Sequence, residues 1–197
     1  MAWVTGTLRR VHEVASSVSL AALNARVIAA RAGAAAMGFV PITHSVDGLA
    51  RDVDQSVTRI ERTAVRAAQC AALAYIVAER AGRFESGFRR LESPDPSLDD
   101  ASRRFAEIVA NKTAALRSTS TALMRDLDRV DALLRSSLTL STLSRIEASR
   151  AQSHRSELAA IGDAIDEAAE VIRKATTECR ARLSTLTAIR AVTTGSR

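Results

Sequence analysis

One uninterrupted series of small and apolar residues constrains this chain more than any other feature. Between residues 46 and 91, such residues recur at alternating steps of three and four without a slip. We call this series the seam; its positions are Val46, Leu49, Val53, Ser56, Ile60, Thr63, Ala67, Cys70, Ala74, Val77, Ala81, Phe84, Phe88 and Leu91. Alternating steps of three and four align side chains along one stripe of a helix and are typical of coiled coils. The spacing therefore predicts a long helix that packs against other helices.

Composition extends this prediction to the rest of the 197 residues. Hydrophobic residues make up 47% of the chain and aromatic residues 3%, with only eight glycines and three prolines. Such a chain, rich in alanine, leucine and arginine, is typical of long helices. A disordered chain would carry fewer apolar residues, a β-sandwich or barrel more β-branched and aromatic residues, and a disulfide scaffold more cysteines. The predicted fold class is therefore all-α.

Three breaks divide the chain into four predicted helices. They lie around the glycine-containing segment 33–42, at a turn over 92–97 that contains Pro94 and Pro96, and near 152–156, where the apolar pattern lapses. Glycine and proline interrupt helices because glycine adopts a left-handed backbone readily and proline lacks an amide hydrogen. The predicted helices span 4–34, 43–91, 98–151 and 156–193.

The other helices carry apolar stripes as well. The first has two, one made of Leu20, Leu23, Val27 and Ala30 and the other of Ala22, Ala25, Ala29 and Ala32, and either can face a core. The third and fourth helices repeat the spacing at Leu116, Ser120, Leu123, Leu127, Val130, Leu134 and Ser137, and at Leu158, Ile161, Ile165, Ala168, Ile172, Ala175 and Cys179. Since no long helix with one exposed apolar stripe is stable alone, we expect the four helices to pack on one another.

Residues 20–50 form the most informative string in the sequence. They read LAALNARVIAARAGAAAMGFVPITHSVDGLA, and this resembles, without a gap, the hairpin tip of the cytoplasmic signalling domain of methyl-accepting chemotaxis receptors. The residues that coincide with the family pattern are Leu20, Leu23, Asn24, Ala25, Ala29, Ala30, Arg31, Ala32, Gly33, Gly38, Phe39, Val46, Leu49 and Ala50. The resemblance implies a helical hairpin with its tip near 34–42.

Several polar positions of the family pattern are changed in this sequence. Ile28 and Ala34 replace glutamates, Met37 and Asp47 replace arginines, and His44-Ser45 replaces an Asp-Glu pair. In the family, polar tip residues support receptor clustering and docking of the histidine kinase and its coupling protein. The resemblance therefore supports the hairpin fold better than control of a kinase. The residues it implies for partner binding, with the equivalents from a second copy described next, are Asn24, Arg31, Ala34, Met37, Phe39, His44, Asp47, Glu147, Arg150 and Asp163.

A fainter second copy of the motif begins at Arg145. Residues 145–151 read RIEASRA, and the offset from Val27 to Ile146 is 119 positions. At this offset the pairs Arg26/Arg145, Ala29/Ala148, Arg31/Arg150, Ala32/Ala151, Ile42/Ile161, Asp47/Asp166 and Ala50/Ala169 are identical. Alanine-rich helices also produce such identities by chance. We nevertheless expect an internal repeat.

An internal repeat would give the chain two comparable hairpins. The first would span 1–91, and the second would span 98–197 with its tip near 152–156. The predicted architecture is a long antiparallel four-helix coiled-coil bundle, a single domain over 1–197. In it one chain would imitate the dimer that chemoreceptors build from two identical chains.

Charge and chemistry narrow the function classes. The 28 Lys+Arg residues exceed the 22 Asp+Glu residues by six, but acidic residues lie near most arginine doublets and aromatic residues are few, so we do not expect nucleic-acid binding. His12, His44 and His154 lack metal-ligand spacing, and no nucleophile motif or phosphate loop is present, so we expect neither a metal, a cofactor nor an enzyme. Cys70 and Cys179 occupy core positions, where we expect buried, reduced thiols.

The expected location is the cytoplasm. The N-terminus has no signal-peptide pattern, and the most apolar stretch, Val18 to Ile42, contains Asn24, Arg26 and Arg31, which argues against a transmembrane segment. The resemblance implies a chemoreceptor-like signalling or scaffold protein without its own sensor domain. Its tips would bind chemosensory proteins (a receptor, coupling protein or histidine kinase) or a second copy of the chain. The alternative is a structural protein whose amphipathic helices coat a hydrophobic surface, as phasins do.

Overall fold

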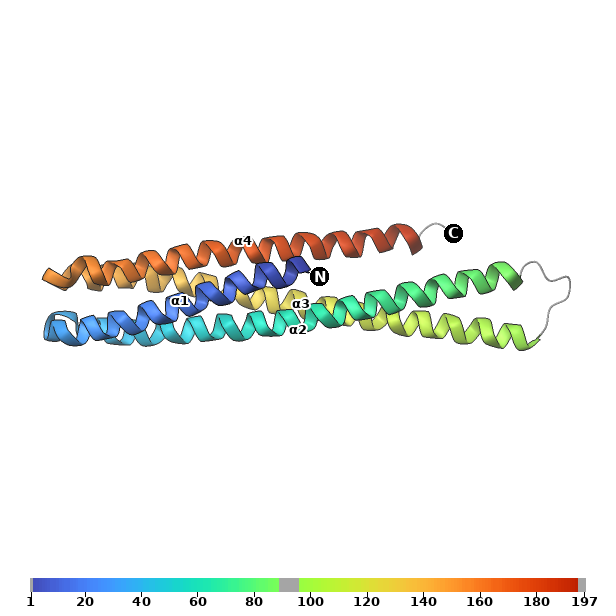
Figure 1. Ribbon diagram of the computed structural model, residues 1–197, viewed down its shortest axis with the longest axis horizontal. Helices are drawn as coiled ribbons and strands as arrows, with labels where there is room; N and C mark the ends of the chain where they lie inside the picture. The colour runs from blue at the N-terminus through green and yellow to red at the C-terminus, as the bar shows by residue number, and fades with distance from the viewer. Residues whose placement is uncertain (1, 89–95, 195–197) are drawn as a thin grey trace. The chain divides into compact units, whose positions relative to one another are not determined.

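The computed structural model describes residues 2–88 and 96–194, and within them the side chains of 6–83, 86–87, 100–151 and 153–183. This part of the chain is helical throughout, apart from two short connections, which confirms the all-α prediction (Figure 1). The elements are α1 (Ala2–Ala32), the 3-10 turn η1 (Gly33–Ala36), α2 (Phe39–Phe88), α3 (Pro96–Arg150), the 3-10 turn η2 (Gln152–His154) and α4 (Arg155–Thr194). The predicted turn over 92–97 lies mostly outside the described residues.

The helix boundaries follow from local backbone chemistry. Gly33 has a φ of +64°, the left-handed conformation that ends a helix and that glycine adopts without strain. The second helix begins at Phe39, four residues before the predicted start, because Pro41 lies in its first turn, where no amide hydrogen is needed. Pro96 is the first residue of α3 for the same reason.

The described residues form two compact units. Unit 1 contains Arg62–Leu123, and unit 2 contains Ala2–Glu61 together with Met124–Arg197. Unit 1 therefore holds the C-terminal part of α2 and the N-terminal part of α3. Unit 2 holds α1, α4 and the remaining parts of α2 and α3.

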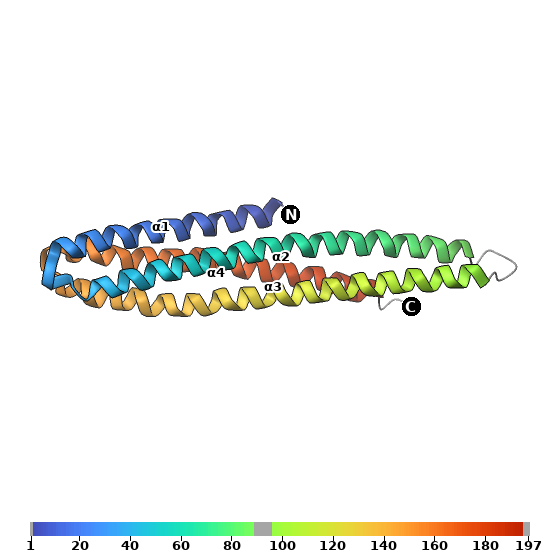
Figure 2. The ribbon, with the colours of Figure 1, turned by 90° about the horizontal axis from the view of Figure 1, so that it is seen from below.

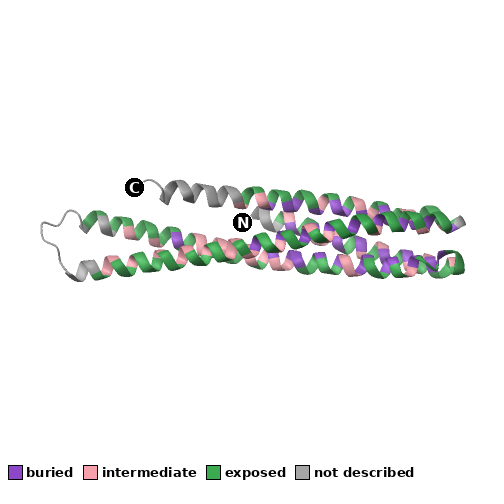
Figure 3. Cartoon of the chain, turned by 180° about the vertical axis from the view of Figure 1, so that it is seen from behind, coloured by how far each residue is buried: buried purple, intermediate pink, exposed green. Residues whose placement is uncertain are grey.

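The four helices of unit 2 pack against each other around one apolar core. Its largest fully buried side chains are Phe39, Ile60, Leu127, Leu158 and Ile165, contributed by α2, α3 and α4. Figure 3 shows the buried residues as stripes along these helices. Most of the predicted stripe positions within unit 2 are buried; these are Val46, Val53, Ser56, Ile60, Leu127, Val130, Leu134, Ser137, Leu158, Ile161, Ile165, Ala168, Ile172, Ala175 and Cys179.

Helix α1 buries its alanine stripe and exposes its leucine stripe. Ala22, Ala25 and Ala29 are buried in the cluster that contains Leu158, Ile161 and Ile165 of α4. By contrast, Leu20, Leu23 and Val27 are 62%, 51% and 49% exposed. The facing side chains explain the choice. Phe39 and Val46 of α2 and the large residues of α4 fill the core opposite Ala22, Ala25 and Ala29, where small side chains fit. From the sequence, either stripe could face the core. The volume of the side chains on α2 and α4 determines which one does.

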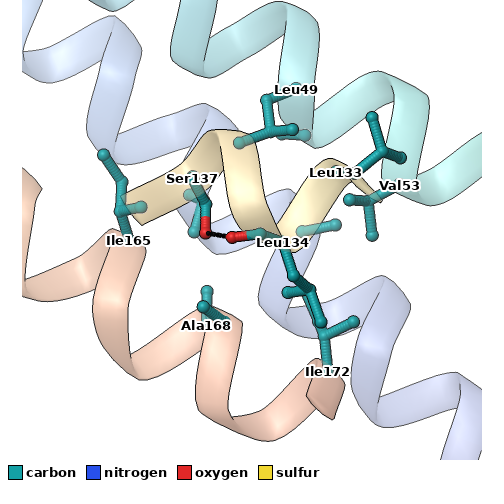
Figure 4. Close-up of a pocket in the computed structure, with 12 residues that line it drawn as sticks. Leu49, Val53, Leu133, Leu134, Ser137, Ile165, Ala168 and Ile172 are labelled. Carbon is teal, nitrogen blue, oxygen red and sulfur yellow. Dashed lines mark hydrogen bonds between the residues drawn. The ribbon is translucent and has the colours of Figure 1, made fainter. Parts of the chain in front are cut away.

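A small void remains between the four helices of unit 2. Its volume is about 30 Å³, and its lining is almost entirely apolar (Figure 4). Leu49 and Val53 of α2 face Ile165 and Ile172 of α4 across it, and the Ser137 hydroxyl bonds to the Leu134 carbonyl at 2.8 Å. The void is about the size of one water molecule, and its lining offers almost no polar group that could bind one. We therefore interpret it as a packing gap and not as a substrate site.

The two helical segments of unit 1 bury only part of the side chains that lie between them. On the seam within it, Ala74 is buried, while Thr63, Ala67, Cys70, Val77 and Ala81 are half-buried; the side chains of Phe84, Phe88 and Leu91 lie outside the described residues. The two cysteines consequently differ. Cys179 in unit 2 is buried as predicted, whereas Cys70 in unit 1 is only half-buried, which corrects the expectation of a second buried thiol.

The two stripes of α1 give a direct stability test. We expect Ala25→Leu to lower the free energy of unfolding by about 1–3 kcal/mol, because extra methylenes do not fit a close-packed site. Leu23→Ala, two positions away on the exposed face, should change it by less than about 0.5 kcal/mol. Urea unfolding followed by circular dichroism measures both. A larger loss from Leu23→Ala than from Ala25→Leu would show that α1 packs through the other stripe.

The thiols should react at different rates. Desolvation by burial raises the pKa of Cys179 to about 11, with the nearby Glu178 carboxylate adding to the shift and Arg182 opposing it. Because the thiolate is the reactive form, Cys179 should stay protonated and unmodified by a thiol reagent at pH 8 until the protein unfolds. Cys70 should react in the folded state. Mass spectrometry of timed labelling reads both sites, with Cys70→Ser as the control that should leave a single slow thiol.

Candidate functional site

Two helix breaks lie at the same end of unit 2. Figures 1 and 2 show the connection between α1 and α2 beside the connection between α3 and α4. A side-chain contact links them: a Cβ atom on Gly38 would lie 2.8 Å from Cδ of Glu147, so the α3 carboxylate rests against the backbone of the α1–α2 connection. We call this end of unit 2, comprising residues 19–51 and 141–166, the tip.

A polar cluster joins α1 to α2 at the tip. The guanidinium of Arg26 contacts the Thr43 hydroxyl and His44 Nδ1, each at 3.4 Å. Further along, Ser19 donates to the buried carboxylate of Asp47 at 2.6 Å, and Arg51 pairs with the same carboxylate. The Asp47 carboxylate therefore has a partner on each of the two helices, and its bond to Ser19 fixes the position of α1 along α2.

A second cluster joins α3 to α4. Arg145 donates to Asp163 at 2.8 Å and to Asp166 at 2.6 Å. These hydrogen bonds, Asp163 first, raise the pKa of Arg145 above its usual value. Desolvation alone would raise the pKa of Asp166, but hydrogen bonds from Ser141 and Arg145 outweigh it and the pKa is lowered. The contribution of Asp166 to stability is thus present above its unfolded pKa and is lost as the pH falls through its lowered folded pKa.

The two clusters are related by the offset of 119 positions found in the sequence. Arg26 and Arg145 each reach a side chain 18 residues further along, His44 and Asp163 respectively. Burial follows the same offset: pairs of buried positions are Leu8/Leu127, Val11/Val130, Ala15/Leu134, Ala22/Ser141, Ala25/Ser144, Ala29/Ala148, Phe39/Leu158, Val46/Ile165, Val53/Ile172 and Ile60/Cys179. Surface positions agree as well, since Val27 and Ile146 are 49% and 47% exposed.

The predicted partner-binding residues divide into a surface set and a buried set. Phe39 is fully buried and Asp47 nearly so, so neither side chain is presented at the surface. Glu147 is half-buried and pairs with Arg150 at 2.8 Å. The exposed members of the set are Asn24, Arg31, Ala34, Met37, His44, Arg150 and Asp163.

The sequence did not single out the apolar part of the tip surface. Leu20, Leu23 and Val27 continue into the exposed Met37, and Leu143 and Ile146 are exposed on α3. The spacing of Leu20, Leu23 and Val27 is that of a coiled-coil stripe, so the signal was present, but it was read as a core candidate. Arg26 and Arg145 were detectable too, as identical residues 119 positions apart.

The part of the chain that the structure describes has no cluster of metal-ligating side chains. Within it, no group of three or more His, Cys, Asp or Glu residues could hold a metal ion. Every buried side-chain nitrogen or oxygen in that part also has a hydrogen-bond partner. His44 lies near Arg26, and His154 lies 3.2 Å from Glu157, so each contacts an ordinary surface neighbour.

Among the described residues, one stretch is long and apolar enough, by length and composition, to cross a membrane. It is Gly6–Ala36, and it contains the three residues that argue against a membrane helix, Asn24, Arg26 and Arg31. The core helix of a soluble protein and a signal sequence near an N-terminus meet the same criterion. Here the apolar composition has a packing role, because the buried positions from Leu8 to Ala29 recur at steps of three and four.

Comparison of the chain with protein-family models, curated proteins and solved structures found no match.

The two glycines of the α1–α2 connection, Gly33 and Gly38, should respond differently to substitution by alanine. Gly33→Ala places a side chain at positive φ, and we expect it to lower the free energy of unfolding by about 1–2 kcal/mol. Gly38 lacks a positive φ, and its added methyl would meet only the mobile end of Glu147, so Gly38→Ala should cost less and should displace that carboxylate.

Thermal and urea unfolding of the two variants provide the comparison. The control combines Gly38→Ala with Glu147→Ala. In the Glu147→Ala background, Gly38→Ala should no longer lower the free energy of unfolding, because the side chain that it would meet is absent. A larger cost for Gly38→Ala than for Gly33→Ala would contradict the assignment of the turn.

Proposed function

We propose that this chain is a cytoplasmic, chemoreceptor-like signalling or scaffold protein that acts through its tip and carries out no catalysis. The observation that carries the proposal is the exposed apolar stripe Leu20, Leu23 and Val27 beside the motif that resembles the chemoreceptor hairpin tip. A stripe with coiled-coil spacing on the outside of a helix is suited to another helix. The partner would be a chemosensory protein: a receptor, a coupling protein or a histidine kinase.

The proposed architecture is an antiparallel four-helix coiled coil in which two hairpins repeat and imitate a receptor dimer within one chain. Two findings support it. First, α1 and α2 run antiparallel, as in a hairpin. As residue numbers increase along α1, their partners on α2 have decreasing numbers: His12–Asp54, Ser19–Asp47 and Arg26–Thr43. The polar clusters around Arg26 and Arg145 also follow the offset of 119 positions.

An imitation dimer would display two related surfaces at its tip. Val27 and Ile146 occupy equivalent positions and are exposed to a similar extent. The polar surroundings differ, because His44 stands where the second hairpin has Asp163. The proposal therefore includes two docking faces of similar shape and different charge. A partner that carries a basic surface would prefer the face with Asp163.

Binding to a chemosensory coupling protein tests the proposal. We expect the wild-type chain to retain the coupling protein in a pull-down, and Leu23→Asp with Val27→Asp to weaken binding at least about tenfold, since a carboxylate in an apolar contact is left desolvated and unpaired. Leu73→Asp, an exposed leucine of unit 1, is the matched control and should bind as wild type. Circular dichroism verifies that all variants remain helical.

Two outcomes would contradict the proposed function. One is the absence of binding to receptor, coupling protein and kinase alike. The other is equal loss of binding in the tip variant and the Leu73→Asp control. The coat function predicts something different, namely a gain of helix only upon binding to a lipid or hydrophobic particle; such a gain, with a non-cooperative melt in solution, would favour that alternative.

A further inference from the structure

Three exposed arginines lie close together on the part of α3 that belongs to unit 2. Arg125 and Arg129 are about one helical turn apart, and Arg135 follows them. None of the three has an ion pair or a side-chain hydrogen bond with another residue that the structure describes. Small exposed side chains accompany them, namely Ala132, Ser136 and Thr139. We call these six residues the arginine face.

Each arginine of the face has one aspartate within reach on α3. Side chains three or four positions apart on a helix are neighbours and can form an ion pair. The aspartates at that spacing are Asp128 for Arg125, Asp126 for Arg129 and Asp131 for Arg135. Pairing within α3 could therefore neutralise the whole face.

The three aspartates bind arginines of other helices instead. Asp126 lies 3.6 Å from Arg59 of α2. On the other side of α3, Arg180 of α4 donates to Asp128 at 2.8 Å and to Asp131 at 2.6 Å. The carboxylates of this stretch thus connect α3 to its neighbours, and the positive charges of the arginine face stay without a partner in the fold.

Elsewhere the chain neutralises exposed arginines within the same helix. Arg51, Arg83 and Arg182 each pair with a carboxylate four positions before them. Arg129 has Arg125 at that position, and like charges at this spacing destabilise a helix. A local rule that is broken without compensation inside the fold points to a contact outside it.

We propose that the arginine face binds an acidic helix of a partner protein, with one carboxylate opposite each guanidinium. Charge complementarity carries the proposal, because a guanidinium holds a carboxylate through two parallel hydrogen bonds. The formal net charge of +6 also attracts an acidic partner before contact. The small side chains of Ala132, Ser136 and Thr139 allow the backbone of a second helix to approach α3 closely.

The size of the face fits a helix better than it fits other anions. The face runs from residue 125 to 139, which at the α-helical rise is about 21 Å, or four turns of a partner helix. A protein that binds DNA commonly contacts about six to ten phosphates. Basic segments that bind anionic membranes contain about four to eight Lys or Arg residues. Three arginines with no aromatic residue among them are too few for either.

This inference is independent of the proposed function, because the arginine face and the tip share no residue. At the offset of 119 positions, the residues of α1 that correspond to the three arginines are Gly6, Arg10 and Ser16. The face therefore has no counterpart on α1. We expect one acidic helix to bind each chain, and the tip to stay available for its own partner.

Fluorescence anisotropy with a labelled model peptide tests the proposal on the full chain. The probe is an alanine-based helical peptide with three glutamates at the spacing of Arg125, Arg129 and Arg135. We expect one peptide to bind per chain, more weakly as salt is raised, since exposed ion pairs are screened. Arg125→Gln with Arg129→Gln and Arg135→Gln should weaken binding at least about tenfold.

The matched control removes the same net charge from other places. Arg10→Gln with Arg62→Gln and Arg66→Gln replaces three exposed arginines outside the face and should bind the peptide nearly as wild type does. A peptide with glutamine in place of each glutamate should not bind the wild type. Urea unfolding of the variant that lacks the three face arginines should show no loss of stability, because those arginines have no partner in the fold.

Three results would overturn the proposal. They are the absence of saturable peptide binding, equal weakening in the face variant and the matched control, and a loss of stability in the face variant. Tighter binding of a DNA duplex or of phosphatidylserine vesicles than of the peptide, lost in the face variant, would assign the face to phosphates instead. The face variant should still bind the coupling protein, which separates a failure here from a failure of the proposed function.

Discussion

The packing of alanine against large aliphatic residues is the interaction on which unit 2 depends. Ala22, Ala25 and Ala29 of α1 meet a core already filled by Leu158, Ile161 and Ile165 of α4. Each alanine contributes little apolar area, but it lets the two helices approach closely, so that many weak dispersion contacts add up. The same arrangement turns Leu20, Leu23 and Val27 outward. One packing choice therefore creates both the core of unit 2 and the apolar surface of the tip.

The regular part of the fold was predictable because it depends on local spacing. The steps of three and four fixed which side of α2, α3 and α4 is buried, and Gly33 marked the end of α1. The orientation of α1 was not predictable from spacing, because both of its stripes have helical periodicity. Choosing between them requires the volumes of side chains on α2 and α4, which are distant in sequence. The half-burial of Cys70 was missed for a similar reason, since periodicity does not reveal how many helices surround a seam.

The position of the tip was predictable from the sequence, but the burial of its side chains was predicted less well. The motif located the hairpin, and the offset of 119 positions found the partner cluster around Arg145. Sequence reasoning treated Phe39 and Asp47 as surface residues, yet Phe39 completes the core and Asp47 is buried with Ser19 and Arg51 as partners. From the sequence, a charged residue such as Asp47 is expected to be exposed. The hydroxyl that lets it be buried belongs to Ser19, which lies 28 positions away in the chain. Conversely, the stripe of Leu20, Leu23 and Val27 on α1 was visible in the sequence, but its spacing suits a core face as well as a surface.

The buried serines of α3 have a mechanical consequence. Ser137, Ser141 and Ser144 direct their hydroxyls to carbonyl oxygens of their own helix. The hydroxyls of Ser137 and Ser144 therefore make their hydrogen bonds within α3. The Ser141 hydroxyl also hydrogen-bonds to Asp166 of α4. Other directional bonds between α3 and its neighbours lie at the surface, where Arg145 reaches Asp163 and Asp166 and where Arg180 of α4 reaches Asp128 and Asp131. A small rotation of α3 about its own axis is therefore opposed by exposed ion pairs, which are individually weak, and by the buried contact between Ser141 and Asp166.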